Sequence, residues 1–315
     1  MIVSASRRTD LAACYPEWLS RRLREGYVLV PHPRNSRRLS RVALSPETVD
    51  CLVLWTKNPA PFFSYLDEVE KRYPFYFQFT LTPYGRATEP GLPSKEELLE
   101  VFCALSRRLG PDRVDWRYDP ILLDARHTTA YHLDRFEALC RRLNEHTGRC
   151  ILSFADPYRH LGDRVRPVAE ADQRALACGL SRIAARYRLP LFTCAEHLDL
   201  SEYGIRHASC IDPEKIGRLL GCRIQAGPDP GQRPDCGCVE SVDIGAYDTC
   251  SNGCIYCYAT TSRARTAGNI ARHDPLSPML VGRPTGEEMV TERKMRSVRT
   301  EQTSLFVFRE GVKED

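Results

Sequence analysis

The sequence lacks any apolar run that approaches the roughly 18 residues needed to cross a membrane. The first twenty residues already include Arg7, Arg8, Asp10 and Glu17, which argues against a secretory signal peptide. We also find no internal repeat and no low-complexity tract over the 315 residues. These absences predict a globular cytoplasmic protein that neither spans a membrane nor belongs to a repeat class.

A strong net charge is also lacking, since the formal charge is +4 with 27% charged residues. This balance falls short of the basic footprint typical of nucleic-acid-binding proteins. It is compatible with an anionic substrate, because arginine side chains bind phosphate and carboxylate well. A basic N-terminal group could serve this purpose or could simply be a solvated face: Arg7, Arg8, Arg34, Arg37, Arg38 and Arg41.

Cysteine, in contrast, is abundant, with 14 residues. In a chain of this size without a signal peptide, such a count indicates reduced thiols and metal binding rather than a disulfide scaffold. Six cysteines are scattered, mostly within apolar patterns, and are predicted to be small core residues: Cys14, Cys51, Cys103, Cys140, Cys150 and Cys178. The other eight gather near the C-terminus, as ligands do: Cys194, Cys210, Cys222, Cys236, Cys238, Cys250, Cys254 and Cys257.

Three of the clustered cysteines, Cys250, Cys254 and Cys257, have the spacing C-x3-C-x2-C. A structural zinc site closes with four ligands, whereas an iron-sulfur cube held by three thiolates keeps one iron open. Gly253 suits a short loop that wraps a bulky cluster, because glycine takes positive φ without penalty. The alternative is a zinc knuckle that recruits a histidine such as His273.

Cys236-Gly-Cys238, together with Cys194 and Cys210, supplies four thiols that this triad does not use, and Cys222 is left over. Two cysteines separated by glycine can point at one metal. Four ligands suit either an auxiliary iron-sulfur cluster or a structural zinc ion. The alternative for Cys194 is a core residue at the end of a strand.

The triad loop, with Tyr256 just before the third cysteine, resembles the cluster loop of the radical S-adenosylmethionine (SAM) superfamily. That resemblance implies that the triad holds a 4Fe-4S cluster whose open iron takes the amino and carboxylate groups of SAM. It implies that the cluster reductively cleaves SAM to a 5'-deoxyadenosyl radical, which abstracts hydrogen from a substrate. It also implies that Tyr256 lies against the adenine and that a donor such as flavodoxin or ferredoxin supplies the electron.

The position of the loop departs from that superfamily, whose members usually carry it near the N-terminus. The whole pattern resembles an uncharacterised bacterial family of unknown function with a C-terminal triad, and this resemblance brings no substrate. It rests on the triad and on residues 4–10 (SASRRTD), 55–59 (WTKNP), 116–120 (WRYDP), 236–238 (CGC) and 273–278 (HDPLSP).

Short β-rich runs alternate with amphipathic helical stretches along the chain, which predicts an α/β fold with successive βα units. The strands are expected at residues 2–5, 51–55, 76–80, 113–117, 150–154, 189–193 and 239–244. We expect a complete or partial TIM-type barrel, circularly permuted so that the strand before the triad comes last. The expected divisions are a barrel body (1–235) with a β-hairpin inserted at about 26–45, a cysteine-rich segment (236–285) that completes the barrel, and a tail (286–315) in which residues 304–308 could add an edge strand.

Polar clusters follow the predicted strands, and in a barrel these would converge on one mouth. We predict that SAM is bound by Tyr256, Arg8, Thr9, Asp10, Asp119 and Asp156, and the substrate by Arg7, Lys57, Arg117 and Glu196. The alternative is that these residues are helix caps and rim ion pairs, since Thr9 and Asp10 are good N-caps.

The leading hypothesis is therefore a radical SAM enzyme whose substrate and reaction the sequence does not identify. Tyrosines on both sides of Cys257, Tyr256 and Tyr258, are similar to those of the spore photoproduct lyases. A nucleic-acid substrate is accordingly the second enzyme hypothesis. Two further alternatives are a non-catalytic zinc or iron-sulfur binding protein and an iron-sulfur redox sensor.

Overall fold

Eight parallel strands form the central sheet of the protein in a computed structural model that describes residues 1–32 and 35–300. Arg34 and the strand expected at 304–308 lie outside these residues. The order across the sheet is β10 (Val242–Asp243), β1 (Ile2–Ala5), β4 (Cys51–Thr56), β5 (Phe75–Thr80), β6 (Val114–Ile121), β7 (Cys150–Phe154), β8 (Leu191–Thr193) and β9 (Arg206–His207). The α/β class and the parallel sheet agree with the sequence-based expectation.

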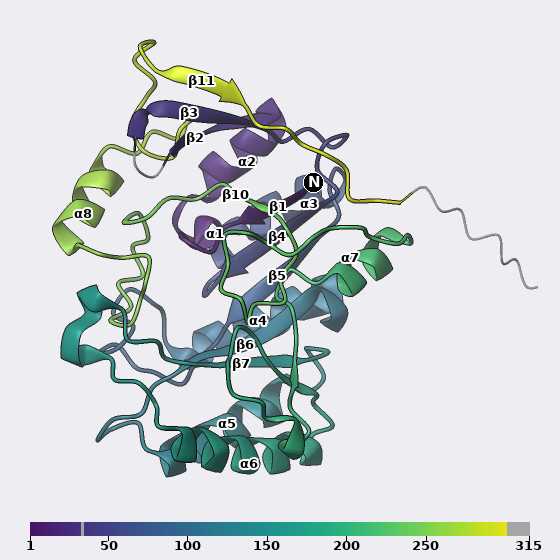
Figure 1. Cartoon of the computed structure of the whole chain (residues 1–315), viewed down its shortest axis with the longest axis vertical. Coiled ribbons are helices and arrows are strands. Elements are labelled where there is room, and N and C mark those ends of the chain that lie inside the picture. The colour runs from purple at the N-terminus through teal and green to yellow at the C-terminus, as the bar shows by residue number, and fades with distance from the viewer. Residues whose placement is uncertain (33–34, 301–315) are drawn as a thin grey trace, which may run out of the picture.

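The central strands of this sheet are buried on both faces, as their near-continuous apolar sequences predict. Helices lie between successive strands along the chain and cover the sheet (Figure 1). Their bounds are α1 (Leu11–Cys14), α2 (Pro16–Glu25), α3 (Leu66–Glu70), α4 (Lys95–Leu109), α5 (Thr129–Leu143), α6 (Glu170–Arg186), α7 (Pro213–Leu220) and α8 (Arg263–Ala271). Short 3-10 helices span Ala60–Tyr65, Pro111–Arg113, Arg159–Arg164 and Ser201–Tyr203.

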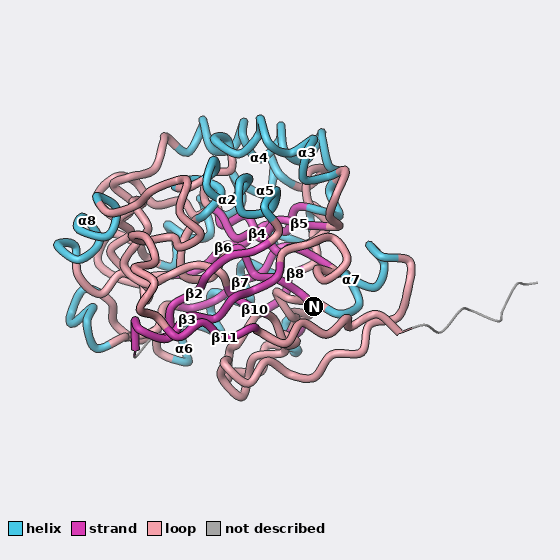
Figure 2. The backbone as a smooth tube through the Cα atoms, turned by 90° about the horizontal axis from the view of Figure 1, so that it is seen from above, coloured by secondary structure: helices cyan, strands magenta, loops and turns pink. Residues whose placement is uncertain are grey.

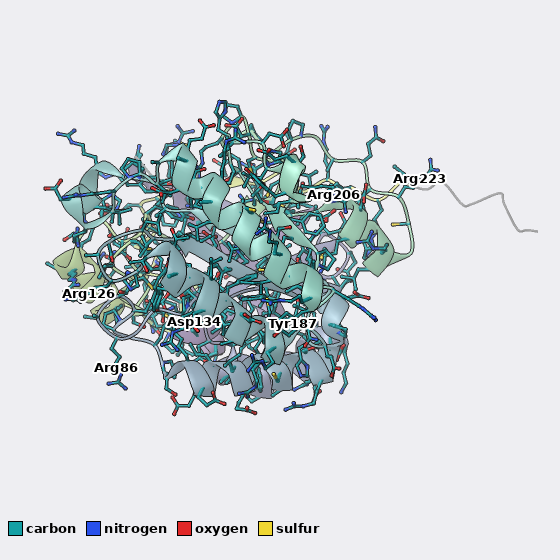
Figure 3. The ribbon with its side chains drawn as sticks, turned by 90° about the horizontal axis from the view of Figure 1, so that it is seen from below. Arg86, Arg126, Asp134, Tyr187, Arg206 and Arg223 are labelled. Atoms are coloured by element: carbon teal, nitrogen blue, oxygen red, sulfur yellow. The ribbon has the colours of Figure 1, made fainter. Side chains whose placement is uncertain are left out.

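Helices α3, α4 and α5 group on one side of the strands when the molecule is viewed from above (Figure 2). From below, α5 and α6 are seen to pack against each other (Figure 3). The labelled residues Asp134 and Tyr187 mark α5 and the C-terminal end of α6 in that view.

The sheet does not close into a barrel, because β10 and β9 form its two edges among the described strands. Both edge strands contain two residues. The strand expected at 239–244 is shortened because Val239 donates its N–H to Ile211 O (3.2 Å) instead of extending β10. A complete barrel is therefore not formed by the described residues.

A second, three-stranded sheet contains β2 (Tyr27–His32), β3 (Asn35–Ala43) and β11 (Met289–Glu292). Strands β2 and β3 pair antiparallel, at the place where a hairpin is expected, and β11 pairs parallel with β3. Just beyond β11, Val298 N–H donates to Asp50 (2.8 Å). The first half of the expected tail thus lies against the body of the protein.

None of the helices in the described part of the chain is both long and apolar enough to cross a membrane.

One buried histidine makes the stability of this fold depend on pH. His132 on α5 has no exposed surface; its Nε2 donates to Leu122 O (2.7 Å), so its Nδ1 accepts from the Tyr118 hydroxyl (2.8 Å). Burial lowers the pKa of His132 from 6.5 to about 4, against the Leu122 hydrogen bond, which raises it. Between about pH 4 and pH 6.5, the unfolded chain binds a proton at His132 that the folded chain does not bind. Acidification through this range therefore favours unfolding.

We expect the free energy of unfolding to fall by about 2 kcal/mol between pH 7 and pH 5 because of His132 alone. Urea unfolding at both pH values should show a shallower pH dependence for His132→Gln than for the wild type. His146→Gln, in the turn after α5, is the matched control and should keep the wild-type dependence. If His132→Gln kept the wild-type pH dependence of unfolding, His132 would not be its source.

Candidate functional site

The triad Cys250, Cys254 and Cys257 lies in the loop that follows strand β10. Gly253, between the first two cysteines, has a φ of 65°. This left-handed conformation is one that glycine adopts without steric penalty. The loop therefore turns sharply at the position where the sequence predicts it.

The segment after β1 holds this loop, because β1 pairs with β10 and the two chain segments continue side by side. Thr9 Oγ1 lies 2.7 Å from Thr249 Oγ1, and Asn252 Nδ2 donates to Asp10 (3.1 Å). Asp10 also accepts from Ala13 N–H as the N-cap of α1. Both Thr9 and Asp10 are thus engaged in cap and loop contacts, the alternative role considered for them.

Gly91 packs against the backbone of the triad loop. Its N–H donates to Asn252 O (2.9 Å), and an added Cβ would lie 2.6 Å from Ser251 O. These neighbours are backbone atoms of the loop, so they cannot move aside as a flexible side chain would. The absence of a side chain at position 91 therefore allows the loop to pack at this depth.

We expect Gly91→Ala to reduce the free energy of unfolding by about 1–3 kcal/mol, because overpacking must displace the loop backbone. The displaced segment is the loop that carries the triad. Gly85→Ala is the matched control, because a Cβ there meets no atom within 4 Å. Urea unfolding that gives equal values for the two variants would contradict the close approach.

The thiols of the triad have different neighbours. Burial raises the pKa of Cys254 to about 12, although the nearby Lys57 charge opposes this shift. Cys250 Sγ lies 4.0 Å from the thiol of Cys14, at the end of α1. Cys14 was expected to be a core residue, whereas it is half-buried and contacts the triad. In the sequence, this contact of Cys14 was indicated by its position: Cys14 comes four residues after Asp10, in the segment that follows β1.

Tyr256 belongs to a buried charged network that the sequence analysis did not find. Its hydroxyl donates to Glu89, a residue with 1% relative exposure that also binds Lys57 (2.9 Å) and Lys95. Burial alone would raise the pKa of Glu89, but the two lysines outweigh it and lower the pKa to about 2. Lys57 also lies over the Tyr256 ring, 5.4 Å from its centroid.

A second cysteine group lies near the other edge of the sheet. The sulfur atoms of Cys194, Cys236 and Cys238 lie within 4.8 Å of one another, which could hold a metal ion. Cys210 packs in the same buried cluster as Cys194 and Cys238, against which Cys236 also packs. Its thiol accepts from the guanidinium of Arg117. All four cysteines predicted from the sequence therefore come together.

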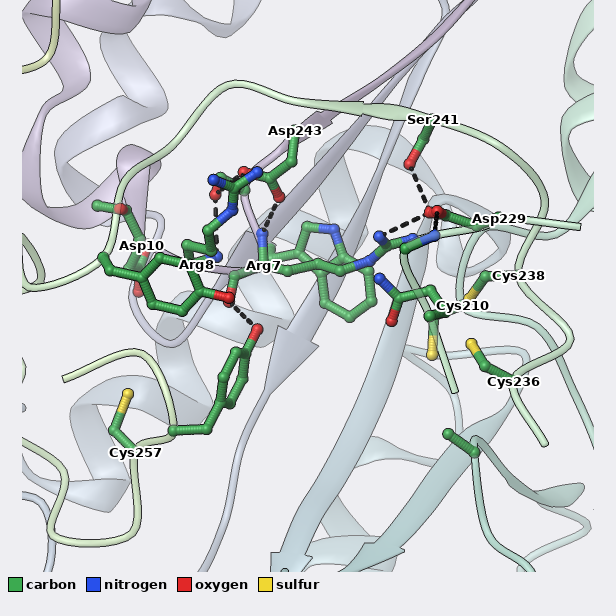
Figure 4. Close-up of a pocket in the computed structure, with 18 of the residues that line it drawn as sticks. Arg7, Arg8, Asp10, Cys210, Asp229, Cys236, Cys238, Ser241, Asp243 and Cys257 are labelled. Atoms are coloured by element: carbon green, nitrogen blue, oxygen red, sulfur yellow. Dashed lines mark hydrogen bonds and ion pairs between the residues drawn. The ribbon is translucent and has the colours of Figure 1, made fainter. Parts of the chain in front are cut away.

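Both cysteine groups line one cavity of about 1080 Å³. In Figure 4, Arg7 and Arg8 lie between Cys257 on one side and Cys210, Cys236 and Cys238 on the other. The predicted SAM and substrate residues that line this cavity are Arg7, Arg8, Thr9, Asp10, Lys57, Arg117, Asp119, Asp156 and Tyr256.

The arginines of the cavity wall already have acidic partners. Arg7 contacts Asp229 (2.9 Å), and Arg8 contacts Asp243 (3.3 Å). Asp243 is the last residue of β10 and also accepts from Ser6 and from Arg7 N–H, so it ties the segment after β1 to this strand. The sequence analysis did not identify Asp229 or Asp243.

The predicted carboxylates differ in their surroundings. Asp119 pairs with Arg117, and Asp156, which is more exposed, pairs with Arg233 (2.8 Å). Glu196 is not among the residues that line the cavity; it accepts from Ser153 Oγ (2.7 Å) just behind the wall. Burial raises the pKa of Glu196 to about 7.

A family model described as a domain of unknown function (DUF1848) matches residues 2–259, which include both cysteine groups. No curated protein matches the sequence. Among solved structures, the chain is similar to a protein of Bacteroides thetaiotaomicron VPI-5482 that is provisionally assigned as an alpha-L-fucosidase. The similarity has a TM-score of 0.33 and 11% identity over 64% of this chain and 76% of that chain, which is too weak to support an argument.

Proposed function

The chain belongs to the family described as a domain of unknown function, DUF1848, and we propose that it is a radical SAM enzyme. In this proposal Cys250, Cys254 and Cys257 hold a 4Fe-4S cluster, and SAM binds at the open iron. The bound pair supplies reductive cleavage of SAM and hydrogen abstraction from the substrate. The observation that carries the proposal is that all three thiols of a C-x3-C-x2-C loop line one cavity of about 1080 Å³.

The donor set fits a cluster better than a single ion. Each thiolate of an iron-sulfur cube binds a different iron, so the three sulfur atoms must be spread apart. Within the described residues, three potential ligands lie within 4.8 Å of one another in the other cysteine group and not in the triad. Cys14 does not line the cavity, so its thiol lies away from the side that SAM would approach.

The neighbours of the triad can orient SAM. The hydrogen bond from Tyr256 to Glu89 holds the aromatic ring in one position at the cavity wall, which suits stacking on adenine. Asp119 and Asp156 offer carboxylate oxygens for ribose hydroxyls, and Arg8 offers a cation for the SAM carboxylate. Thr9 and Asp10 also line the cavity and contact the triad loop at Thr249 and Asn252.

The topology supports a permuted, partial barrel. Strand β10 is the last of the eight strands along the chain, yet it lies beside β1, the first. The loop that follows β10 therefore meets the loop that follows β1. In barrels and open α/β sheets, chemistry takes place where parallel strands end. Both loops that would bind the cluster and SAM are at this edge.

We further propose an anionic substrate. The guanidinium groups of Arg7 and Arg117 lie over the same ring, that of Trp55, at 5.7 and 5.0 Å from its centroid. With Lys57, they place three cationic groups on the cavity wall, and an anionic substrate would compete there with their acidic partners Asp229, Asp119 and Glu89. An external electron donor such as flavodoxin or ferredoxin and a cytoplasmic location complete the proposal, and the free state of all fourteen cysteines, each within the described residues, supports a reducing compartment.

The proposal is tested by anaerobic reconstitution with iron and sulfide, followed by addition of SAM and dithionite. We expect about four irons per triad and formation of 5'-deoxyadenosine, measured by chromatography. The variant Cys250→Ala/Cys254→Ala/Cys257→Ala should lose these irons and the SAM cleavage together. Cys222→Ser, which lies outside both cysteine groups, should retain both.

A wild-type protein that binds no iron at the triad would overturn the proposal. So would a fully loaded cluster that leaves SAM intact under dithionite, which would indicate a redox sensor instead. A folded triple variant, checked by circular dichroism, ensures that the loss of iron reflects the missing thiols.

A further inference from the structure

We propose that Cys194, Cys210, Cys236 and Cys238 bind one zinc ion in a tetrahedral site that is distinct from the triad. The site does not depend on the proposed radical SAM activity. Four thiolates are the ligand set of closed, structural zinc sites, which leave no position for a substrate. Three of the sulfur atoms already lie within 4.8 Å of one another without the ion, and Cys210 packs in the same buried cluster and lines the same cavity.

The spacing favours a single ion over a second cluster. With zinc-sulfur bonds of about 2.3 Å, the sulfur atoms of a tetrahedral site lie roughly 3.8 Å apart. Thiolates that bind different irons of a cube are spread around the whole cluster and cannot all approach so closely. The two cysteine groups of this chain therefore suit different occupants: a compact ion in this group and a bulky cluster in the triad.

The surroundings offset the negative charge of four thiolates. Arg117, whose side chain is 8% exposed, donates to Cys210 Sγ, and the backbone N–H of Ile211 donates to Cys238 Sγ (3.3 Å). Donors of this kind around metal-bound sulfur orient the ligands and stabilise their charge. Three of the four ligands are shielded, since Cys194, Cys210 and Cys238 have relative exposures of 7%, 1% and 2%, whereas Cys236 is half-buried.

The four ligands come from the two parts of the chain that a closed barrel would join. Cys194 and Cys210 follow the last strands at one edge of the sheet, β8 and β9, whereas Cys236 and Cys238 lie in the link that leads to β10 at the other edge. That link contains little regular structure; one of its few backbone contacts to the β9 side is Val239 N–H to Ile211 O. The ion would fasten the two edges where direct strand pairing is absent.

The test uses the triad variant Cys250→Ala/Cys254→Ala/Cys257→Ala, because any metal left in it belongs to the second group. Purified from cells grown with iron and zinc, it should contain about one zinc per chain and no acid-labile sulfide. Adding Cys236→Ser and Cys238→Ser should remove the zinc, whereas adding Cys222→Ser should leave it. The proposal would be overturned if the triad variant contained iron with sulfide or contained no metal at all. It would also be overturned if zinc remained bound after Cys236→Ser and Cys238→Ser were added.

A cobalt titration decides the geometry without relying on the folding of the serine variants. The triad variant, stripped of zinc by a chelator, should bind one cobalt with the intense visible absorption of a tetrahedral thiolate site. One equivalent of zinc should abolish that absorption. Cobalt spectra typical of octahedral coordination, or absorption that zinc does not displace, would contradict a four-thiolate zinc site.

Discussion

Glu89→Gln is expected to reduce the free energy of unfolding by about 3–5 kcal/mol, because it removes the anionic partner of buried lysines. Glu89 is 1% exposed, and Lys57, its partner at 2.9 Å, has a side-chain exposure of 14%. Glutamine keeps the shape and can still accept from Tyr256 and Thr82, but it leaves Lys57 as an uncompensated charge. Urea unfolding at pH 7 measures the difference.

The matched control is Glu100→Gln, which breaks the exposed ion pair of Glu100 with Arg142 (2.6 Å). Exposed pairs contribute about 0–1 kcal/mol, so this variant should unfold almost as the wild type does. Equal losses of unfolding free energy in Glu89→Gln and Glu100→Gln would mean that the buried network around Glu89 does not stabilise the fold. The double variant Lys57→Met/Glu89→Leu should recover part of the loss, because it removes both charges at once.

The same network makes a pH prediction. The lowered pKa of Glu89, about 2 against 4.5 in the unfolded chain, means that its contribution to stability is present above pH 4.5. This contribution is lost as the pH falls from 4.5 towards 2, because the unfolded chain takes up the proton first. Glu89→Gln should therefore differ from the wild type much less at pH 3 than at pH 7.

The sheet could be predicted from the sequence because its strands are continuous apolar runs bounded by polar clusters. Strands β1, β4 and β7 begin where the sequence predicts, since burial on both faces leaves a local signal. Helix α7 also had local signals that the sequence analysis passed over: the Asp212 cap and Gly221 at its end, with φ 64°. What local patterns could not reveal is that two-residue edge strands leave the sheet open.

The two cysteine groups were predictable for a similar reason, since spacing within a short segment is a local property. The contacts that surround them are not local. Glu89 is 167 residues from Tyr256, and Cys14 is 236 residues from Cys250, so only the folded chain brings these pairs together. Glu196 shows that a local pattern can also mislead. Like the other predicted site residues it is a polar residue that follows a strand, but it does not line the cavity.

Arg117→Met is expected to weaken zinc binding at the second cysteine group by about 10–100-fold, the range typical for loss of a partner that contacts a ligand. Arg117 lies between Cys210, to which it donates, and Asp119, and its guanidinium lies 5.0 Å from the Trp55 ring centroid. Methionine fills a similar volume but supplies neither the charge nor the donor. Competition with a chromophoric chelator, carried out in the triad variant, gives the zinc affinity.

Arg149→Met separates this effect from a general loss of stability. Arg149 is also a largely buried arginine and has two acidic partners, Asp115 and Asp212 (2.7 Å each). Within the described residues its side chain makes no hydrogen bond to a thiol. Both variants should unfold at lower urea concentrations, because Arg117→Met leaves Asp119 and Arg149→Met leaves Asp212 without a cationic partner. Zinc affinity should fall in Arg117→Met alone; an equal fall in both would assign the loss to destabilisation, and no fall in either would remove Arg117 from the site.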